Sequence, residues 1–272
     1  MCAVTARVIV GFVAAAVIAT IARRRGLLSS GGVIAAIGAG TLAVGAGIRW
    51  GILLVGYFIA ASMLSRWRQM QKAAVTRGVV TKHGARDAWQ VLANGGVFLS
   101  TAIAAAITER EVAIAAALGA LAASMADTAA TEVGTAVGGE PRSIITGQKV
   151  AIGMSGGVTV AGTIAMLGGS LVLGTIALAL GFSSHAAWAA LAGGMAGALA
   201  DSLLGAVVQE RRRCPACGAL TERRVHLCPS VGTEGIATDV VGGVRGFDND
   251  WVNLTSTAIG ALVAAVLSRG GV

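Results

Sequence analysis

The chain has 272 residues, of which 55% are hydrophobic and only 12% are charged, and its mean hydropathy is +0.78. A soluble domain carries about 25% charged residues, so this composition excludes an ordinary soluble protein and predicts a single integral membrane domain over residues 1–272. The net charge of +8 would favour nucleic acid as the partner of a soluble protein; in a membrane protein it indicates basic cytoplasmic loops, and we expect no nucleic-acid partner.

Apolar runs of about 20 residues, long enough to cross a bilayer, recur along the chain. The first run ends at Arg23-Arg24-Arg25 and leads into another apolar run instead of a small-residue cleavage site, so we interpret it as a membrane helix and not as a removed signal peptide. The pattern predicts an all-α, polytopic fold with about eight transmembrane helices, at Val4–Ala22, Leu27–Ala46, Ile48–Ser65, Ala88–Ile107, Val112–Thr131, Gly157–Leu180, Ala186–Gln209 and Trp251–Ser268.

Lys and Arg gather in alternate loops of this predicted topology. All but four of the 21 basic residues fall after the first, third, fifth and seventh spans; the four exceptions are Arg7, Arg49, Arg110 and Arg269. By the positive-inside rule, the four long loops face the cytoplasm and both termini lie outside. We expect a multi-pass protein of the cell membrane, namely the inner (cytoplasmic) membrane of a prokaryote.

Two acidic residues are predicted to lie at the same depth on different helices. At 1.5 Å per residue, Asp127 is about 24 Å from Glu111, and Asp201 is about 25 Å from Ser184. Both therefore fall near the cytoplasmic boundary of the hydrocarbon core, where a carboxylate is costly and indicates a functional site. Other polar residues are predicted to reach this layer, namely Asn94, Glu132, Asp248, Asp250 and Asn253.

Each acidic motif has a structural alternative. Asp127-Thr-Ala-Ala-Thr-Glu132 indicates metal binding or a proton relay, or else a helix that ends in a polar loop, which remains open for Glu132 in particular. Asp201 lies in a glycine stripe typical of a close helix crossing; its oxygens fit Mg²⁺, and the alternative is a structural pair with Thr or Arg. Asp248-Asn-Asp250 lacks the glycine and closing glutamate of an EF-hand, and its alternative is an acidic helix cap.

Candidate phosphate-binding groups lie in the predicted cytoplasmic loops. Ser155-Gly156-Gly157 opens the sixth predicted span, where backbone N–H groups at a helix start bind anions. Two pairs of basic residues could neutralise a phosphate: Lys82 with Arg86, and Arg142 with Lys149. For each basic residue taken singly, plain anchoring at the cytoplasmic face is the alternative.

The predicted cytoplasmic loop 209–250 carries a separate cluster of metal-ligating residue types. Cys214-Pro-Ala-Cys217 followed by His226-Leu-Cys228 supplies four ligands of the structural zinc type, in a compartment where thiols stay reduced. A redox pair or unligated thiols are the alternatives.

The order of these motifs between Arg86 and Leu267 resembles one known family. Gln90-Val-Leu-Ala-Asn-Gly-Gly96, Asp127-Thr-Ala-Ala-Thr-Glu132, Ser155-Gly-Gly-Val158, Asp201-Ser-Leu-Leu-Gly205 and Asp248-Asn-Asp-x-Val-Asn253 occur in sequence, with the Cys/His loop before the last. This resembles the multi-pass membrane family that contains the plant phytyl-phosphate kinase of the vitamin E pathway and animal transmembrane-protein relatives. Members are distantly similar to dolichol kinase and CTP-dependent cytidylyltransferases.

The resemblance implies a CTP-dependent kinase that converts an isoprenoid monophosphate of the phytyl or geranylgeranyl type into a diphosphate. Under this interpretation Asp127, Asp201 and Asp250 are catalytic and, with Asp248 and the secondary candidate Glu132, hold Mg²⁺. Asn94 and Asn253 orient phosphates, and the Ser155–Gly157 amides neutralise them together with the four basic residues named above. The sequence is compatible with either a monomer or an oligomer.

Two other functions compete with this interpretation. A transporter of an ion or an anionic solute, such as an isoprenoid phosphate, predicts acidic groups at mid-membrane and an internal repeat. A structural membrane protein with a zinc loop predicts no layer of carboxylates.

Overall fold

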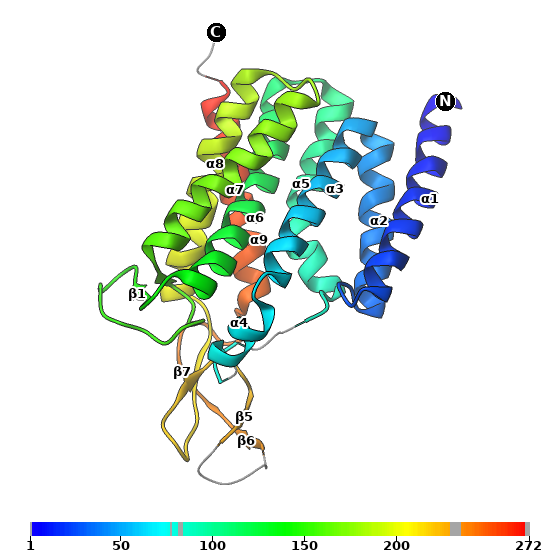
Figure 1. Cartoon of the computed structure of the whole chain (residues 1–272). Helices are drawn as coiled ribbons and strands as arrows, with labels where there is room; N and C mark the ends of the chain where they lie inside the picture. The colour runs from blue at the N-terminus through cyan, green and yellow to red at the C-terminus, as the bar shows by residue number, and fades with distance from the viewer. Residues whose placement is uncertain (1, 77, 81–83, 229–234, 270–272) are drawn as a thin grey trace.

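The computed structural model describes residues 2–76, 78–80, 84–228 and 235–269 as a helical bundle with a small β lobe at one end (Figure 1). The described long helices are α1 (Cys2–Arg24), α2 (Ser30–Ala46), α3 (Ile48–Arg66), α5 (Ala88–Thr108), α6 (Glu111–Val137), α7 (Val160–Ala179), α8 (Ser184–Val207) and α9 (Asn249–Leu267). Seven of them are long and apolar enough to cross a membrane, and α2, at 17 residues, is about 26 Å long. The predicted all-α, polytopic membrane fold is confirmed.

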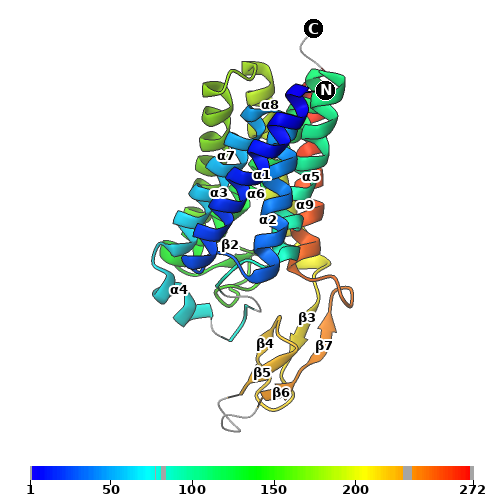
Figure 2. The ribbon, with the colours of Figure 1, turned by 90° about the vertical axis from the view of Figure 1, so that its right-hand side faces the viewer.

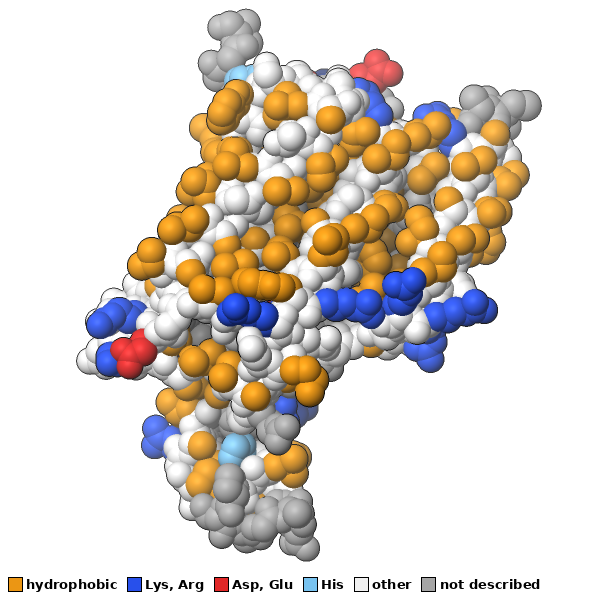
Figure 3. All heavy atoms as spheres, in the orientation of Figure 1, with side chains coloured by type: hydrophobic (Ala, Val, Ile, Leu, Met, Phe, Trp, Pro, Cys, Tyr) orange, Lys and Arg blue, Asp and Glu red, His pale blue; other side chains and the backbone are white. Residues whose placement is uncertain are grey.

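The two ends of the bundle differ in charge. The described termini lie at one end, and the segments that connect α1 to α2, α3 to α5, α6 to α7 and α8 to α9 lie at the other (Figure 1). We call the second end the loop end. Figure 3 shows a broad band of exposed apolar side chains over the helices, bordered toward the loop end by Lys and Arg. Trp67, Trp89 and Trp251 are partly exposed at this border, as is typical of a membrane interface.

Helix α6 is the core of the bundle and packs against α5, α7, α8 and α9. Small residues let these helices approach closely: a Cβ on Gly197 of α8 would lie 2.4 Å from the Cβ of Ala123 on α6. A Cβ on Gly193 would lie 2.4 Å from the carbonyl oxygen of Gly260 on α9. The close crossing expected from the glycine stripe is therefore confirmed, and it places Asp201 inside the protein.

Two predicted helix boundaries need correction. Helix α6 continues to Val137, six residues beyond the expected end at Thr131, so Glu132 is part of the helix and not of the following loop. Helix α7 begins at Val160 and not at Gly157, because Thr159 is the N-cap residue and its side chain accepts a hydrogen bond from the Gly162 N–H. Positive φ angles at Gly153 (86°) and Gly156 (78°) turn the preceding segment away from helical geometry.

The loop end contains the remaining described elements. Helix α4 (Gln69–Thr76) follows α3, and the antiparallel pair β1 (Arg142–Ser143) and β2 (Gly157–Val158) lies between α6 and α7. Between α8 and α9, the order β4-β3-β7 forms a three-stranded sheet, and β5 pairs with β6. These strands, β3 (Arg211–Arg213), β4 (Leu220–Thr221), β5 (Val225–Leu227), β6 (Gly235–Ala237) and β7 (Asp239–Gly242), form the projection below the bundle that we call the Cys/His lobe (Figure 2).

Candidate functional site

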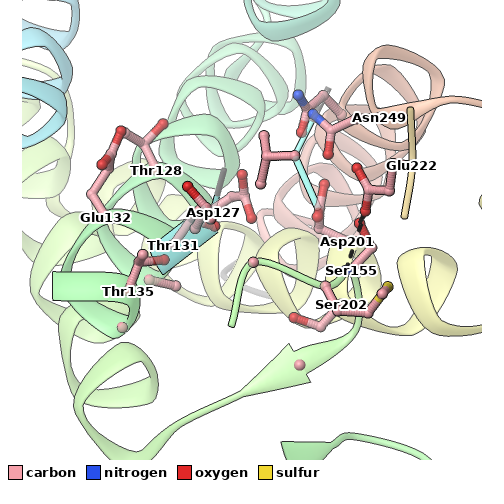
Figure 4. A pocket seen from close by; sticks show the side chains of 18 of the residues that line it. Asp127, Thr128, Thr131, Glu132, Thr135, Ser155, Asp201, Ser202, Glu222 and Asn249 are labelled. Atoms are coloured by element: carbon pink, nitrogen blue, oxygen red, sulfur yellow. Dashed lines mark hydrogen bonds between the residues drawn. The ribbon is translucent and has the colours of Figure 1, made fainter. Parts of the chain in front are cut away.

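A cavity of about 640 Å³ lies at the loop end, where α3, α5, α6, α8 and α9 meet α4, the segment 152–159 and the Cys/His lobe (Figure 4). Its described lining includes seven of the 13 acidic residues of the chain: Asp127, Glu132, Asp201, Glu210, Glu222, Asp248 and Asp250. The cationic side chains of the described lining are Lys72, Arg86 and Arg224. A cavity with this excess of carboxylates attracts divalent cations and disfavours a phosphate that arrives without one.

Asp127 on α6 and Asp201 on α8 form an acidic pair in the cavity. Their carboxyl groups lie close enough to interact, and the Ser256 hydroxyl on α9 donates a hydrogen bond to Asp201 Oδ2 at 3.1 Å. Asp201 lies six residues before the end of α8, about 9 Å along the axis. The shared depth expected for the two aspartates is therefore present, and it results from the close packing of α6, α8 and α9.

The first turn of α9 brings further oxygens to the cavity. Asp250 is 2% exposed and, like Asn253, lines the cavity from inside the bundle. Asp248 has a structural role: it is the N-cap residue of α9, and its Oδ1 accepts hydrogen bonds from the N–H groups of Asp250 (3.1 Å) and Trp251 (3.4 Å). Asp248 therefore has the role of its helix-cap alternative, and because it also lines the cavity, its metal-ligand role stays a prediction.

Glu132 contacts a cationic side chain, that of Lys72, which the sequence assigned only to a predicted cytoplasmic loop. Lys72 on α4 forms an ion pair with Glu132 Oε2, and its Nζ donates to the carbonyl oxygens of Leu64 (2.9 Å) and Ser65 (3.0 Å). The side chains of Lys72 and Glu132 are only 8% and 22% exposed. This pair anchors α4 against α6. Glu132 therefore has a structural role as the partner of Lys72, and its role as a metal ligand stays a prediction.

Arg86 and Asn94 reach the cavity from the start of α5. The Arg86 N–H donates to the Leu27 carbonyl oxygen (2.9 Å), and the Arg86 carbonyl oxygen accepts from the Ser29 N–H (3.0 Å). Asp87 and Gln90 then form a capping box that begins α5. The Asn94 side-chain amide donates to the Gln90 carbonyl oxygen at 2.9 Å, and both Arg86 and Asn94 line the cavity. Lys82, the predicted partner of Arg86, lies outside the described residues.

The predicted phosphate cradle at Ser155, Gly156 and Gly157 is not supported by the hydrogen bonds. The Ser155 amide donates to Glu222 Oε1 at 3.3 Å, and its hydroxyl donates to the same oxygen. The Gly157 amide donates to the Met154 carbonyl oxygen at 3.1 Å. A Cβ on Gly156 would lie 2.5 Å from that of Ala206. All three residues line the cavity, but two of the three amides are already used and Gly156 packs closely against α8.

The described lining of the cavity does not include Arg142 or Lys149, and their predicted phosphate contacts stay a prediction. Arg142 Nη1 donates to the Gly147 carbonyl oxygen at 2.8 Å. Lys149 forms an exposed ion pair with Glu140 at 2.6 Å. Both residues belong to the hairpin around β1. Their side chains contact other residues of this segment, Gly147 and Glu140, and do not line the cavity.

Besides Lys72, three charged lining residues were not predicted, namely Glu210, Glu222 and Arg224. Burial raises the pKa of Glu222 above its usual value of 4.5, and the hydrogen bonds from Ser155 offset part of this effect. For Glu210, hydrogen bonds from the Gly246 N–H and from Arg212 outweigh burial and hold its pKa below 4.5. No local motif marks these residues, because they reach the cavity only through the fold of the Cys/His lobe.

The four predicted zinc-type residues converge at a second place. The ligand atoms of Cys214, Cys217, His226 and Cys228 all lie within 4.8 Å of one another, in the Cys/His lobe. Cys217 is exposed, and the other three residues are buried.

Comparison with known proteins places the chain in a family. The family described as "Integral membrane protein DUF92" matches residues 13–261. Protein PGR of Arabidopsis thaliana is 29% identical over 274 residues, which cover 90% of each chain. An uncharacterized membrane protein of Methanocaldococcus jannaschii is 31% identical over 200 residues, which cover 74% of this chain and 76% of the archaeal protein. No solved structure matches. The membership in a multi-pass membrane family that the motif order predicts is confirmed: the chain belongs to the integral membrane protein family DUF92.

Proposed function

We propose that this protein is a CTP-dependent kinase that phosphorylates a prenyl monophosphate, of the phytyl or geranylgeranyl type, to the diphosphate at the loop end of the bundle. The observation that carries the proposal is the convergence of Asp127, Asp201 and Asp250, from three helices, in one cavity at the edge of the membrane-spanning region. CTP as donor, in preference to other nucleotides, rests on the family resemblance.

The acidic residues of the cavity have the chemistry of a Mg²⁺ site. Mg²⁺ takes carboxylate oxygens together with water and phosphate oxygens, and Asp127, Asp201 and Asp250, which line the cavity, would hold it. A bound Mg²⁺ would supply charge neutralisation for the phosphates that meet there. Because carboxylates outnumber cationic groups in the lining, the cavity would repel a nucleoside triphosphate in the absence of divalent cations. Nucleotide binding is therefore expected to depend on Mg²⁺.

The reaction needs little from the protein beyond positioning. An oxygen of the prenyl monophosphate attacks the terminal phosphorus of the nucleotide, the bond from that phosphorus to its bridging oxygen breaks, and the nucleoside diphosphate leaves. The acceptor phosphate is largely dianionic at neutral pH, since its second pKa is about 6, so no general base is required. Arg86 and Arg224 line the cavity and can bind phosphate oxygens with paired N–H groups.

The position of the cavity suits a substrate with an apolar chain. Tyr57, which lines the cavity, lies nine residues before the end of α3, or about 14 Å into the bundle. The opposite part of the lining belongs to the Cys/His lobe outside the bundle. A charged head at the loop end with a tail among the helices fits this depth. With the loop end in the cytoplasm of a prokaryote, as the basic residues favour, the nucleotide arrives from the same side.

The geometry favours a kinase over the transporter alternative. Transport past Asp127 and Asp201 requires acidic groups near the middle of the membrane, whereas Asp201 lies about 9 Å from the loop end of α8. The structural alternative gives no reason for Asp127, Asp201 and Asp250 to converge in one cavity.

The test is an assay of the purified full-length protein in detergent. The protein is incubated with Mg²⁺ and geranylgeranyl or phytyl monophosphate, and with CTP, ATP, GTP or UTP in parallel; prenyl diphosphate is measured by mass spectrometry. We expect diphosphate with CTP, none after chelation of divalent cations, and none when the prenyl alcohol replaces the monophosphate. A folded protein that forms no diphosphate with any of the four nucleotides would contradict the proposal.

A further inference from the structure

We infer that the Cys/His lobe binds one Zn²⁺ ion through Cys214, Cys217, His226 and Cys228, and that this ion holds the wall of the cavity that carries Glu222. This site is separate from the acidic cavity, and its assignment as a zinc site does not depend on the proposed kinase reaction. A zinc site of this kind needs four ligand atoms that are close enough for tetrahedral coordination and have no other bonding role. A role in holding the cavity wall also needs direct contacts between the lobe and the cavity.

The ligand atoms meet the distance requirement. Four ligands at about 2.3 Å from a tetrahedral Zn²⁺ lie about 3.8 Å from one another. The four ligand atoms of this cluster all lie within 4.8 Å of one another. They come from two different β hairpins: Cys214 and Cys217 flank the turn between β3 and β4, while His226 and Cys228 lie in and directly after β5. A random encounter of surface thiols would not place an imidazole from another hairpin in the same shell.

The turn between β3 and β4 has the backbone of a metal-binding knuckle. The Gly218 N–H donates to the Cys214 carbonyl oxygen (2.9 Å), and the Cys214 N–H donates to that of Ala219 (3.0 Å). Gly218 has a φ of 71°, which favours glycine at this position. The backbone amides of Ala216 and Cys217 point to the Cys214 sulfur, and that of Ala219 points to the Cys217 sulfur.

The imidazole of His226 provides an independent indication of a ligand. His226 is 6% exposed, and its Nδ1 is a buried nitrogen with no hydrogen-bond partner among the described residues. A buried polar atom without a partner is unfavourable, and a metal–nitrogen bond would satisfy it. Cys214 and Cys228 are both 0% exposed, so the cluster is closed to solvent on those sides, as in structural zinc sites and unlike a redox pair that must meet a partner thiol.

The lobe needs such a cross-link because it has little core of its own. Its strands are two to four residues long. Isolated hairpins of this size are at best marginally stable in water, and small domains commonly depend on a metal or on disulfides. One ion shared by two hairpins fixes the turn before β4 relative to β5. The residues that follow β4 are therefore fixed as well.

Those following residues connect the lobe to the cavity. The Glu222 N–H donates to the Val79 carbonyl oxygen (3.1 Å), and Arg223 Nε donates to that of Val80 (2.8 Å). Glu222 in turn accepts hydrogen bonds from the amide and the hydroxyl of Ser155. Through these contacts, the ordered hairpin places Glu222 between the segment after α4 and the segment before β2. Loss of the ion is expected to release this wall without touching Asp127 or Asp201.

The first test is the metal content of the full-length wild-type protein, measured by inductively coupled plasma mass spectrometry after purification without added chelator. We expect one zinc per chain, lost in Cys217→Ser and Cys228→Ser and retained in Cys2→Ser, the matched change of the remaining cysteine of the chain. Replacement of zinc by Co²⁺ should give the charge-transfer absorption of thiolate ligands. Wild-type protein without stoichiometric zinc, or with a Cys214–Cys217 disulfide, would overturn the inference, and this measurement needs no variant to fold.

The second test asks whether the ion holds the cavity wall. Hydrogen exchange of backbone amides is compared between zinc-loaded wild-type protein and the same protein after zinc removal. We expect the Ser155 and Glu222 amides to exchange about tenfold faster without zinc, the effect of losing roughly one hydrogen bond's net stabilisation, with unchanged exchange in α2. Equal exchange with and without zinc would reject the connection to the cavity. Neither readout uses kinase activity, so a failure here is distinct from a failure of the proposed function.

Discussion

Asp127 and Asp201 are 74 positions apart in the chain, on α6 and α8, yet their carboxyl groups interact in one cavity. Two carboxylates held together inside a protein repel each other unless a cation or a proton lies with them. The Ser256 hydroxyl satisfies part of Asp201 but carries no positive charge. This relationship is the reason that we propose a divalent cation at the pair.

The first prediction concerns metal affinity. Asp127→Asn and Asp201→Asn each remove one charged oxygen ligand while keeping the size of the side chain, so binding of Mn²⁺, used as a paramagnetic substitute for Mg²⁺, should weaken by at least about tenfold. Electron paramagnetic resonance of free Mn²⁺ in a titration measures the change. The matched control is Glu140→Gln, an exposed acid at the same end but outside the cavity lining, which should bind like the wild type. Unchanged affinity in both aspartate variants would remove the proposed site.

The second prediction concerns the helix crossing that brings the two aspartates together. In Gly197→Ala, the new Cβ would lie 2.4 Å from the Cβ of Ala123, so α6 and α8 must separate. Overpacking of this kind costs about 1–3 kcal/mol, and we expect a lower melting temperature in detergent together with weaker Mn²⁺ binding. Gly168→Ala is the control, because a Cβ there meets nothing within 4 Å. If Gly197→Ala and Gly168→Ala have the same melting temperature, the close crossing does not hold the site.

The third prediction concerns the pair of Lys72 and Glu132. Lys72→Met leaves Glu132 without its cation in a largely buried place and should lower the free energy of unfolding by about 3 kcal/mol. The double variant, with Glu132→Gln added, should recover much of this loss, because no unpaired charge remains. A double-mutant cycle measured by thermal unfolding in one detergent gives the interaction energy. Additive effects of the two substitutions would show that the pair does not anchor α4.

These contacts define what the sequence could predict. Hydropathy located the membrane helices, and the rise of 1.5 Å per residue placed Asp127 and Asp201 at one depth, because both properties are local to a helix. Pairings across the fold are not local: Lys72 and Glu132 are 60 residues apart, and Ser155 and Glu222 are 67 apart. Without tertiary contacts, Lys72 resembled a loop anchor, and Ser155-Gly-Gly resembled an anion site at a helix start.

The Cys-x-x-Cys spacing predicted which side chains lie together better than the Ser155-Gly-Gly motif did. Cys214 and Cys217 are joined by a turn whose geometry follows from the three-residue separation, and His226 and Cys228 lie in and just after one short strand, so the cluster could be expected from residue types and spacing alone. Which wall of the cavity the lobe supports depends on the contacts of Glu222 with Val79 and Ser155, which no local pattern marks.

The fourth prediction concerns pH. Because burial raises the pKa of Glu222 above 4.5, the folded protein binds this proton more tightly than the unfolded chain does. As pH rises from 4.5 through the raised pKa, ionisation of Glu222 therefore lowers stability, and the loss persists at higher pH. Glu222→Gln lacks this effect, so the wild type should lose melting temperature relative to the variant across that interval. A difference in melting temperature between wild type and Glu222→Gln that stays constant at every pH would contradict the buried position of this carboxyl.

The most direct measurement of the central claim is formation of prenyl diphosphate by three purified proteins side by side: wild type, Asp127→Asn and Glu140→Gln. Each is assayed with CTP, Mg²⁺ and geranylgeranyl monophosphate after its folding has been verified by thermal unfolding. We predict product with the wild type and with Glu140→Gln, and a rate at least about 100-fold lower with Asp127→Asn, because charge neutralisation carries most of the phosphoryl-transfer rate. A folded Asp127→Asn protein that forms diphosphate at the wild-type rate would contradict the claim that this acidic cavity is the kinase site.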